Sequence, residues 1–261
     1  MIASLGEGEA GERPARATSA RTWELLATLV LALAVALGSR VFLVEPFRIP
    51  SGSMLPTLLI GDHLFVNKFV YGARIPFFDW HLRGLRDPQR GEVVVFSVAT
   101  DGDQTHPADR RADLPREDFV KRIIGLPGDR IDIVDGVVFV NGEPIEARRR
   151  GDRFADDFGR ELDVSEIALG ERRFAVLDDP GLRSPPATFE VEAGRYFMLG
   201  DNRDWSKDSR EWGTVRQAEI KGPAFLLYWS WNFTGGWLAL LNPATWWSAD
   251  VRWDRIGRAI R

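Results

Sequence analysis

Two serines in the segment from Pro50 to Thr57 (PSGSMLPT) have surroundings suited to a nucleophile. The prolines of this segment fix φ near both of its ends, and the glycine between Ser51 and Ser53 allows a sharp turn. A chain bent in this way can hold a hydroxyl at a constrained apex. Serines between glycine and proline are more often turn formers, so the spacing alone leaves both interpretations open.

A lysine, Lys121, lies within the apolar, strand-like run from Phe119 to Leu126. If its side chain points inward, the loss of hydration disfavours the charged amine and lowers its pKa toward the range of a general base. A serine hydroxyl needs such a base beside it. The alternative is a lysine on an edge strand that faces water.

The segment from Gly200 to Arg210 (GDNRDWSKDSR) is dense in hydrogen-bonding side chains. Such a composition is typical of a polar turn with several ion pairs. We therefore expect only some of its members to approach the reacting atoms.

The amino-acid composition limits the kinds of catalytic and binding site that the chain can contain. The 261-residue chain has no cysteine, so disulfides, thiolate catalysis and cysteine-ligated zinc are excluded, and any nucleophile is an oxygen or an amine. Its histidines, His63, His81 and His106, lack tight ligand spacing, and we expect neither a catalytic metal nor another cofactor. A histidine triad that uses His63 is the enzymatic alternative to a lysine base. The formal net charge of -4 argues against nucleic acid as a partner.

An apolar run, Leu25 to Leu37, resumes at Val41 to Val44. As a helix, this stretch covers roughly 30 Å, the thickness of the hydrocarbon core, and we predict one transmembrane helix over residues 23–44. A cleavable secretory signal is one alternative, and a buried helix of a soluble protein is another, disfavoured because the run is apolar on every face. Residues 1–22 are predicted to be a disordered cytoplasmic tail.

After residue 45 the pattern becomes that of β-strands, and we predict a mainly β domain over residues 45–261. Asn141-Gly142 is typical of a hairpin turn, and Pro127-Gly128 fits the centre of a type II turn. Two polar stretches interrupt the pattern, at residues 100–117 and 146–186. The second predicts an accessory insertion at about residues 141–190. The strands are expected in four apolar runs: Glu92 to Phe96, Arg130 to Val134, Val137 to Val140 and Ala224 to Trp229.

Together these segments resemble the bacterial type I signal peptidase family. The resemblance is carried, in order, by the membrane segment, PSGSMLPTL with the following Gly61-Asp62, RGEVVVF from Arg90, VKRIIGLPGD from Val120 and GDNRDWSKDSR. It implies a signal-peptidase-like β catalytic domain with an accessory insertion, tethered by the N-terminal helix. The chain departs from well-known members in three ways: one span where some have two, Trp205 where asparagine is frequent, and no cysteine pair.

The resemblance also implies a role for each matched residue. Ser53 would be the nucleophile and Lys121 the general base. The hydroxyl of Ser51 would join the backbone N–H of Ser53 in an oxyanion hole, and Ser206 would orient the lysine amine. Asp208 and Arg210 would form a structural ion pair. Two shallow apolar pockets for small substrate side chains would be formed by Phe47, Ile49, Met54, Leu58, Phe119 and Val120.

The implied activity is the removal of signal peptides from exported preproteins after small-x-small residues. Its partners would be preprotein signal peptides and the lipid bilayer, with the export machinery as a further candidate. The enzyme would be single-pass in the cytoplasmic (inner) membrane, with its N-terminus in the cytoplasm and its catalytic domain on the outer (periplasmic or extracellular) face. One alternative is a soluble self-cleaving repressor of the same chemistry, which would need a basic DNA-binding module where this chain has an apolar segment. Another is a membrane-tethered binding protein without activity.

The C-terminal part is rich in tryptophan. Either a membrane interface or simple core packing accounts for this density. The aromatic residues concerned are Trp229, Trp231, Phe233, Trp237, Trp246, Trp247 and Trp253.

Overall fold

The computed structural model describes residues 23–33, 44–72, 84–102, 104–106, 113–182, 184–232 and 250–261. The chain divides into two compact units, Met1–Val41 and Phe42–Arg261. In the first unit, residues 23–33 form a helix with exposed side chains. Among the described residues, no helix has the length and apolar character needed to span a membrane. The predicted tail, and residues 34–43 of the predicted transmembrane helix, lie outside the described residues.

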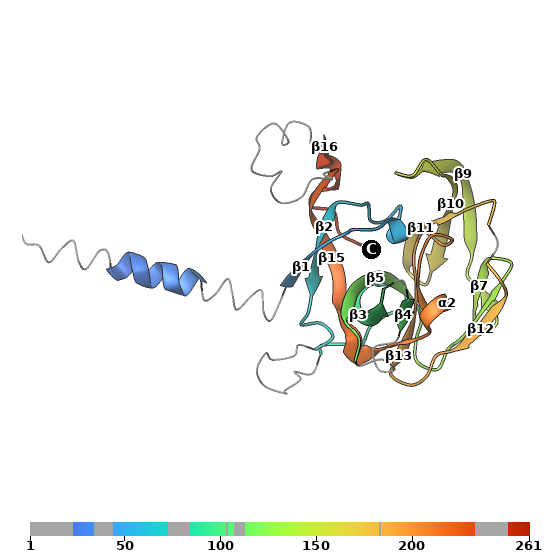
Figure 1. The fold of residues 1–261 in the computed structure, drawn as a ribbon, viewed down its shortest axis with the longest axis horizontal. Coiled ribbons are helices and arrows are strands. Elements are labelled where there is room, and N and C mark those ends of the chain that lie inside the picture. The colour runs from blue at the N-terminus through green and yellow to red at the C-terminus, as the bar shows by residue number, and fades with distance from the viewer. Residues whose placement is uncertain are drawn as a thin grey trace, which may run out of the picture. The chain divides into compact units, whose positions relative to one another are not determined.

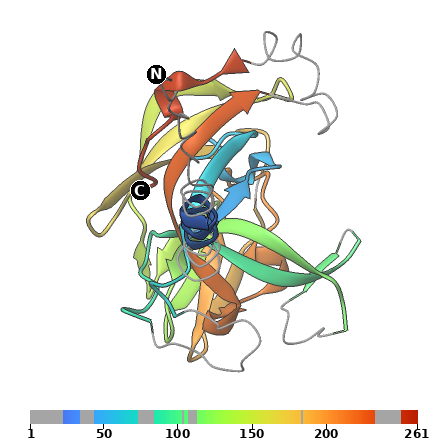
Figure 2. The same ribbon diagram turned by 90° about the vertical axis from the view of Figure 1, so that its left-hand side faces the viewer.

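The largest element of the second unit is a nine-stranded sheet, counted over the described residues. Its main path runs β1-β2-β15-β3-β5-β13-β14, with β16 paired to β15 and β4 paired to β3. Figure 2 shows β3 and β5, in green, running on together as an arm beyond the rest of the sheet. The strands are β1 (Val44–Arg48), β2 (Asp62–Asn67), β3 (Val93–Asp101), β4 (Gln104–His106), β5 (Arg116–Gly125), β13 (Arg195–Leu199), β14 (Val215–Arg216), β15 (Ile220–Asn232) and β16 (Asp250–Val251).

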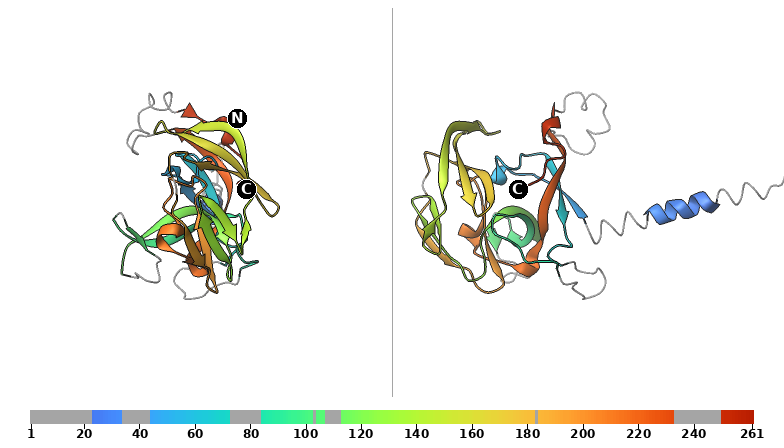
Figure 3. Two further views of the ribbon diagram at one scale, coloured as in Figure 1. Left: turned by 90° about the vertical axis from the view of Figure 1, so that its right-hand side faces the viewer. Right: turned by 180° about the vertical axis from the view of Figure 1, so that it is seen from behind.

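Two smaller sheets occupy most of the chain between β5 and β13. They lie on the side of the unit away from β1, β2 and β15 (Figures 1 and 3). The region predicted as an accessory insertion falls within them. One sheet has the order β12-β6-β7-β8 and the other β11-β10-β9. Their strands are β6 (Arg130–Val134), β7 (Val137–Val140), β8 (Glu143–Pro144), β9 (Ala147–Ala155), β10 (Glu161–Leu169), β11 (Arg172–Asp178) and β12 (Ala187–Glu190).

The predicted strands and turns are confirmed. All four apolar runs fall in strands except for Glu92, which lies one residue before β3, and two of the runs coincide with the bounds of β6 and β7. Asn141 and Gly142 both have positive φ, at 55° and 85°, as the hairpin between β7 and β8 requires. Gly128 has φ of 90°, and the N–H of Asp129 donates to the carbonyl of Leu126 at 3.0 Å, which closes the predicted turn.

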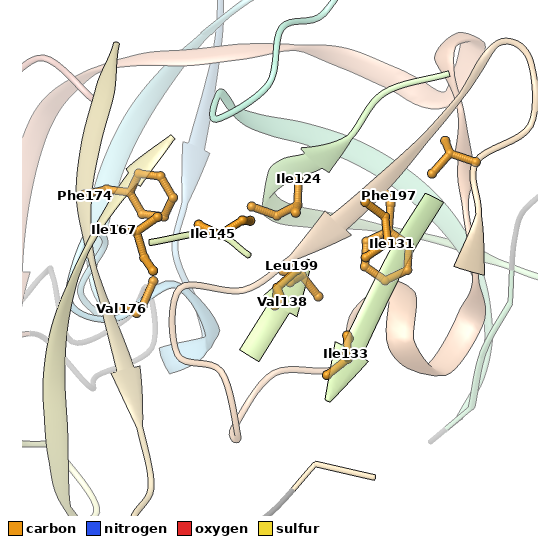
Figure 4. Close-up of a cluster of buried hydrophobic side chains, with 11 residues drawn as sticks. Ile124, Ile131, Ile133, Val138, Ile145, Ile167, Phe174, Val176, Phe197 and Leu199 are labelled. Carbon is orange, nitrogen blue, oxygen red and sulfur yellow. The ribbon is translucent and has the colours of Figure 1, made fainter. Parts of the chain in front are cut away.

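Buried side chains join the small sheets to the large one. In Figure 4, side chains from β6 and β7 meet side chains from β10 and β11, with residues of β5 and β13 between them. A second cluster joins Leu55 to Leu162, Val164 and Leu177. The segment around Ser53 is therefore packed directly against the β9–β11 sheet.

Short helices complete the described part of this unit. The chain turns between β1 and β2 through η1, which lies between the large sheet and β11 (Figure 1). The helices are η1 (Gly52–Met54), α2 (Ser209–Trp212), η2 (Gln217–Glu219) and η4 (Trp253–Arg255).

Candidate active site

The helical turn η1 carries Ser53 and is anchored by the buried side chains that follow this residue. Ser51 precedes it in an extended conformation (φ -133°, ψ 158°), and its side chain makes no capping hydrogen bond. The next two side chains, Met54 and Leu55, are each only 1% exposed. Ser53 is thus held on the surface of a turn whose apolar residues are anchored in the core.

Lys121 reaches Ser53 from the middle of a strand. Its Nζ donates to the Oγ of Ser53 at 2.5 Å, and the side chain is 2% exposed. Strand β5 pairs with β3 on one side, where Lys121 is opposite Val94, and from Arg122 onward it pairs with β13 on the other. The alternative of an edge-strand lysine facing water is therefore wrong.

Burial lowers the pKa of Lys121 from 10.5 to about 8. Among nearby charges, Asp208 raises this pKa and Arg210 lowers it, so the two act in opposite directions. An amine that is neutral at mildly alkaline pH, within hydrogen-bonding distance of a hydroxyl, can accept the proton of that hydroxyl.

The segment after β13 ties η1 to the end of that strand. The backbone N–H of Asn202 donates to the carbonyl of Ser53 at 3.1 Å, and its side-chain amide donates to the carbonyl of Gly52 at 3.0 Å. A Cβ on Gly200 would come within 2.5 Å of the Ser53 carbonyl oxygen, so only glycine fits there. Sequence reasoning did not single out Asn202, although it lies in the polar motif.

Asp208 and Arg210 form an ion pair that shapes this segment. The Nε and Nη2 of Arg210 each donate to a carboxylate oxygen of Asp208 at 2.8 Å, and Asp208 is fully buried. The same carboxylate accepts from the N–H of Gly200 at 3.0 Å, and Arg210 also donates to the carbonyl of Arg203. The pair therefore fixes the loop that holds Asn202.

Ser206 lies on the same loop but makes no hydrogen bond with the lysine. Its Oγ is buried and has no hydrogen-bond partner among the described residues. It lies against Gly200, where an added Cβ would be 2.2 Å from this oxygen. The orienting role of Ser206 stays a prediction.

A buried ion pair lies next to the site, which sequence reasoning also missed. The guanidinium of Arg122 binds both carboxylate oxygens of Asp201, at 2.8 and 2.7 Å. Thr57 donates to the same carboxylate at 2.5 Å. An arginine next to Lys121 in an apolar run, together with an acid in the polar motif, was the available sequence indication.

The residues predicted to form substrate pockets fall into two clusters. Phe119 packs in one, with Phe96 and Trp212. Met54 and Leu58 are almost fully buried, so they lie beneath any pocket surface, whereas Phe47 and Val120 are partly exposed. The other cluster contains Phe47, Ile49, Met54, Leu58 and Val120.

Two strand edges lie open near these residues. β1 is the terminal strand of the sheet path, and β13 pairs with β5 only from Arg122 onward. Within the described part of the chain, residues 117–120 of β5 therefore have a strand partner only on the β3 side. Lys221 on β15 forms ion pairs with Glu45 of β1 at 3.8 Å and Asp118 of β5 at 2.7 Å, so both strands approach it.

A cleft of about 360 Å³ opens at Ser53 and Lys121. Phe158 and Arg160, from the turn between β9 and β10, form part of its lining with Trp205. Sequence reasoning gave no role to Phe158 or Arg160, because nothing in a polar insertion indicates which distant segment it contacts. The cleft is also lined by Ser51, Gly52, Phe119, Asn202 and Lys207.

No described histidine makes a hydrogen bond with Ser53. His63 lies on β2, where its ring packs against Tyr228 and Trp231. His106 pairs with Asp101 at 3.2 Å, and His81 lies outside the described residues. The geometry gives no support to a histidine triad.

The family model and the curated relatives that match this chain are signal peptidases. The family model described as signal peptidase, peptidase S26, matches residues 22–229. Signal peptidase I of Pseudomonas fluorescens is 39% identical over 210 residues, covering 76% of this chain and 69% of that protein. Signal peptidase I of Haemophilus influenzae is 32% identical over 275 residues, covering 91% and 76%. A solved signal peptidase I from Enterococcus faecalis is 25% identical, covering 54% of this chain and 98% of that one, with a TM-score of 0.30.

The family suggested by the sequence motifs is therefore confirmed, and a repressor or a non-catalytic binding protein is set aside. The chain belongs to the signal peptidase family, peptidase S26, and it is a serine endopeptidase.

Proposed function

We propose that this enzyme removes N-terminal signal peptides from exported preproteins, with Ser53 as the nucleophile and Lys121 as the general base. The observation that carries the proposal is the 2.5 Å contact between Lys121 Nζ and Ser53 Oγ, made by a buried amine with a pKa of about 8. The names of the relatives support the choice of substrate.

The proposed reaction begins when neutral Lys121 takes the proton of Ser53 and the Ser53 oxygen attacks the scissile carbonyl carbon. The negative charge that develops on the carbonyl oxygen is stabilised by the Ser51 hydroxyl and the Ser53 N–H. The protonated lysine then gives its proton to the leaving amine. Finally, Lys121 activates a water that hydrolyses the Ser53 ester, and Ser206 orients the amine throughout.

The proposed substrate binds as an extended chain between the open edges of β1 and β5. Backbone pairing of this kind supplies affinity, and pockets for alternate side chains supply specificity. Phe47 and Val120 sit above a packed cluster, which supports shallow pockets for small side chains. A larger side chain there would cost about 1–3 kcal/mol through overpacking, which accounts for cleavage after small-x-small residues.

The proposed location is the outer face of the cytoplasmic membrane, with one N-terminal helix as tether. The apolar run from Leu25 to Val44 supports this, and lipid is then a direct partner. Exposed aromatic side chains such as Trp253 and Phe225 are suited to an interface with lipid. Association with the export machinery is part of the same proposal.

The two serines provide the test. Detergent-solubilised enzyme is incubated with a preprotein, and kcat and KM are measured for Ser53→Ala and Ser51→Ala after each is shown to be folded. Ser53→Ala removes the covalent route, and cleavage should fall to background. Ser51→Ala removes one donor to the transition state and should lower kcat by about 10² to 10³ with KM little changed. Equal losses, or a larger loss for Ser51→Ala, would mean that the roles are assigned wrongly.

A further inference from the structure

A stack of three side chains forms a wall of the catalytic cleft. The guanidinium carbon of Arg160 lies 3.7 Å from the ring centre of Trp205 and 4.9 Å from that of Phe158. We call these three residues the aromatic–arginine wall. Phe158 and Arg160 come from the β9–β10 turn, whereas Trp205 comes from the loop after β13.

Hydrogen bonds to two carboxylates outside the cleft lining hold the aromatic–arginine wall in place. Asp156, whose side chain is fully buried, accepts from the Nε of Arg160 at 2.6 Å and from the backbone N–H groups of Phe158 and Arg160, each at 2.9 Å. Trp205 donates through its indole N–H to Asp179 at 3.1 Å. The sheet that carries the turn is attached to the loop after β13 through Leu177, whose N–H donates to the carbonyl of Asp201 at 2.8 Å. A surface fixed in this way is organised before anything binds.

The outer faces of the wall remain exposed. Phe158 is 69% exposed and Trp205 is 43% exposed. Rigid aromatic faces left open beside reacting groups are typical of a binding surface rather than a core. Since the wall lines the same cleft as Ser53 and Lys121, a chain whose scissile bond lies at Ser53 has to pass it.

Charge indicates what the wall accepts. The cationic side chains of Arg160 and Lys207 both line this cleft. Asp156, the carboxylate that pairs with Arg160, lies behind the wall, and no acidic side chain of the described residues lines the cleft itself. Lys121 is also there, but its pKa is lowered by burial. The cleft therefore favours acidic groups on a bound chain over basic ones.

The side of the substrate follows from the position of the apolar pockets. Of the residues predicted to form pockets before the scissile bond, Phe119 lines this cleft, whereas Phe47 and Val120 do not. Phe158, Arg160 and Trp205 line its other side, beyond Ser53 toward the β9–β11 sheet. We propose that the aromatic–arginine wall binds the first residues after the scissile bond and favours an acidic side chain among them. This inference rests on the proposed function.

The test uses two lengths of peptide substrate with a small-x-small cleavage site. The long one carries five residues after the scissile bond, with Glu, Gln or Lys at the second, and the short one ends after a single residue. Values of kcat and KM are measured for the wild type, Phe158→Ala, Arg160→Gln and Lys207→Gln. Arg153→Gln is the matched control, because Arg153 pairs with an acid (Glu161, 2.9 Å) on the same small sheet without lining the cleft. Melting temperatures establish that each variant is folded.

We expect the wild type to prefer Glu over Lys by about three- to tenfold in kcat/KM, since exposed cation–π and charge contacts are of this strength. Phe158→Ala should lower kcat/KM for long substrates by a similar factor, mainly through KM, and leave the short substrate unaffected. Arg160→Gln and Lys207→Gln should each weaken the preference for Glu, whereas Arg153→Gln should not.

Three results would overturn the inference: no preference in the wild type, equal losses on long and short substrates, or the same effect from Arg153→Gln. Failure of the proposed function looks different. In that case the wild type cleaves none of these peptides, or Ser53→Ala cleaves them as well as the wild type does.

Discussion

Strand β5 carries two neighbouring buried basic residues, Lys121 and Arg122, on its opposite faces, and the two have different interaction partners. Arg122 is fully buried and meets the carboxylate of Asp201 through two hydrogen bonds, the carbonyl of Gly91 at 2.7 Å, and the ring of Phe174 at 3.8 Å from its guanidinium carbon. Lys121 is almost equally buried, but its hydrogen-bond partner is the hydroxyl of Ser53. Adjacent residues of a strand point to opposite faces, which makes this separation possible.

The comparison shows how partners decide what a buried cation does. A carboxylate in direct contact compensates the lost hydration of Arg122, so this residue holds the loop after β13 that contains Asp201. A hydroxyl compensates Lys121 far less, and its pKa falls to about 8 because burial disfavours the charged form. Replacing Lys121 should therefore reduce activity, whereas replacing Arg122 should reduce stability.

The largest expected effect is on activity at the Lys121 face. Lys121→Arg should have no measurable turnover of a preprotein, because a guanidinium keeps its proton at any accessible pH. Lys121→Met, which fills similar space without an amine, should be equally inactive. Lys68→Arg is the control, since Lys68 is a partly exposed residue paired with Glu45 at 3.3 Å, and it should keep full turnover. Near-native turnover of a folded Lys121→Arg enzyme would rule out the lysine as the base.

At the other face the expected loss is of stability. Arg122→Met leaves Asp201 buried without its cation, which should lower the free energy of unfolding by about 3–5 kcal/mol in urea denaturation. The double variant Arg122→Met/Asp201→Leu removes both charges and should recover much of this loss. If the single variant costs less than about 1 kcal/mol, the ion pair is not what holds the loop.

More could be predicted from the sequence about the Lys121 face of β5 than about the Arg122 face. Ser53 and Lys121 were singled out from residue type, an apolar strand pattern and a family resemblance, and the fold brings them together across 68 positions. Local periodicity predicted β6, β7 and the Asn141-Gly142 turn, because these depend on neighbouring residues. Contacts of Arg122 with Asp201, or of Arg160 with Trp205, depend on which distant segments pack together, and no local pattern encodes that.

A smaller effect should appear in the pH dependence of stability. The pKa of Lys121 is about 8 in the folded protein and 10.5 for an ordinary lysine. Between these pH values the unfolded chain binds a proton that the folded protein does not, so stability rises with pH across this window, by roughly 3 kcal/mol. Below pH 8 both states are protonated, and the full cost of burial is present.

Lys121→Met should lack this rise. Urea denaturation of the wild type and the variant from pH 7 to 11 measures it as a difference, in which other titrating groups cancel. A difference that stays constant with pH would mean that Lys121 titrates alike in the folded and unfolded states.

The smallest expected effect concerns the charges around Lys121. Burial is the main cause of its lowered pKa, and the exposed carboxylate of Glu211 acts weakly in the opposite direction. The value of kcat/KM should rise with pH as the neutral amine forms, and level off above an apparent pKa of about 8. Glu211→Gln removes a negative charge that favours the protonated amine, so the rising limb should move to lower pH while the plateau stays unchanged. At pH 7 this variant should therefore be faster than the wild type, most clearly at low salt, because the interaction is screened. Glu192→Gln is the matched control, since Glu192 is exposed and paired with Arg195 at 2.7 Å, and it should leave the profile in place. A limb that moves to higher pH in Glu211→Gln, or that moves equally in both variants, would show that the rate does not follow the protonation of Lys121.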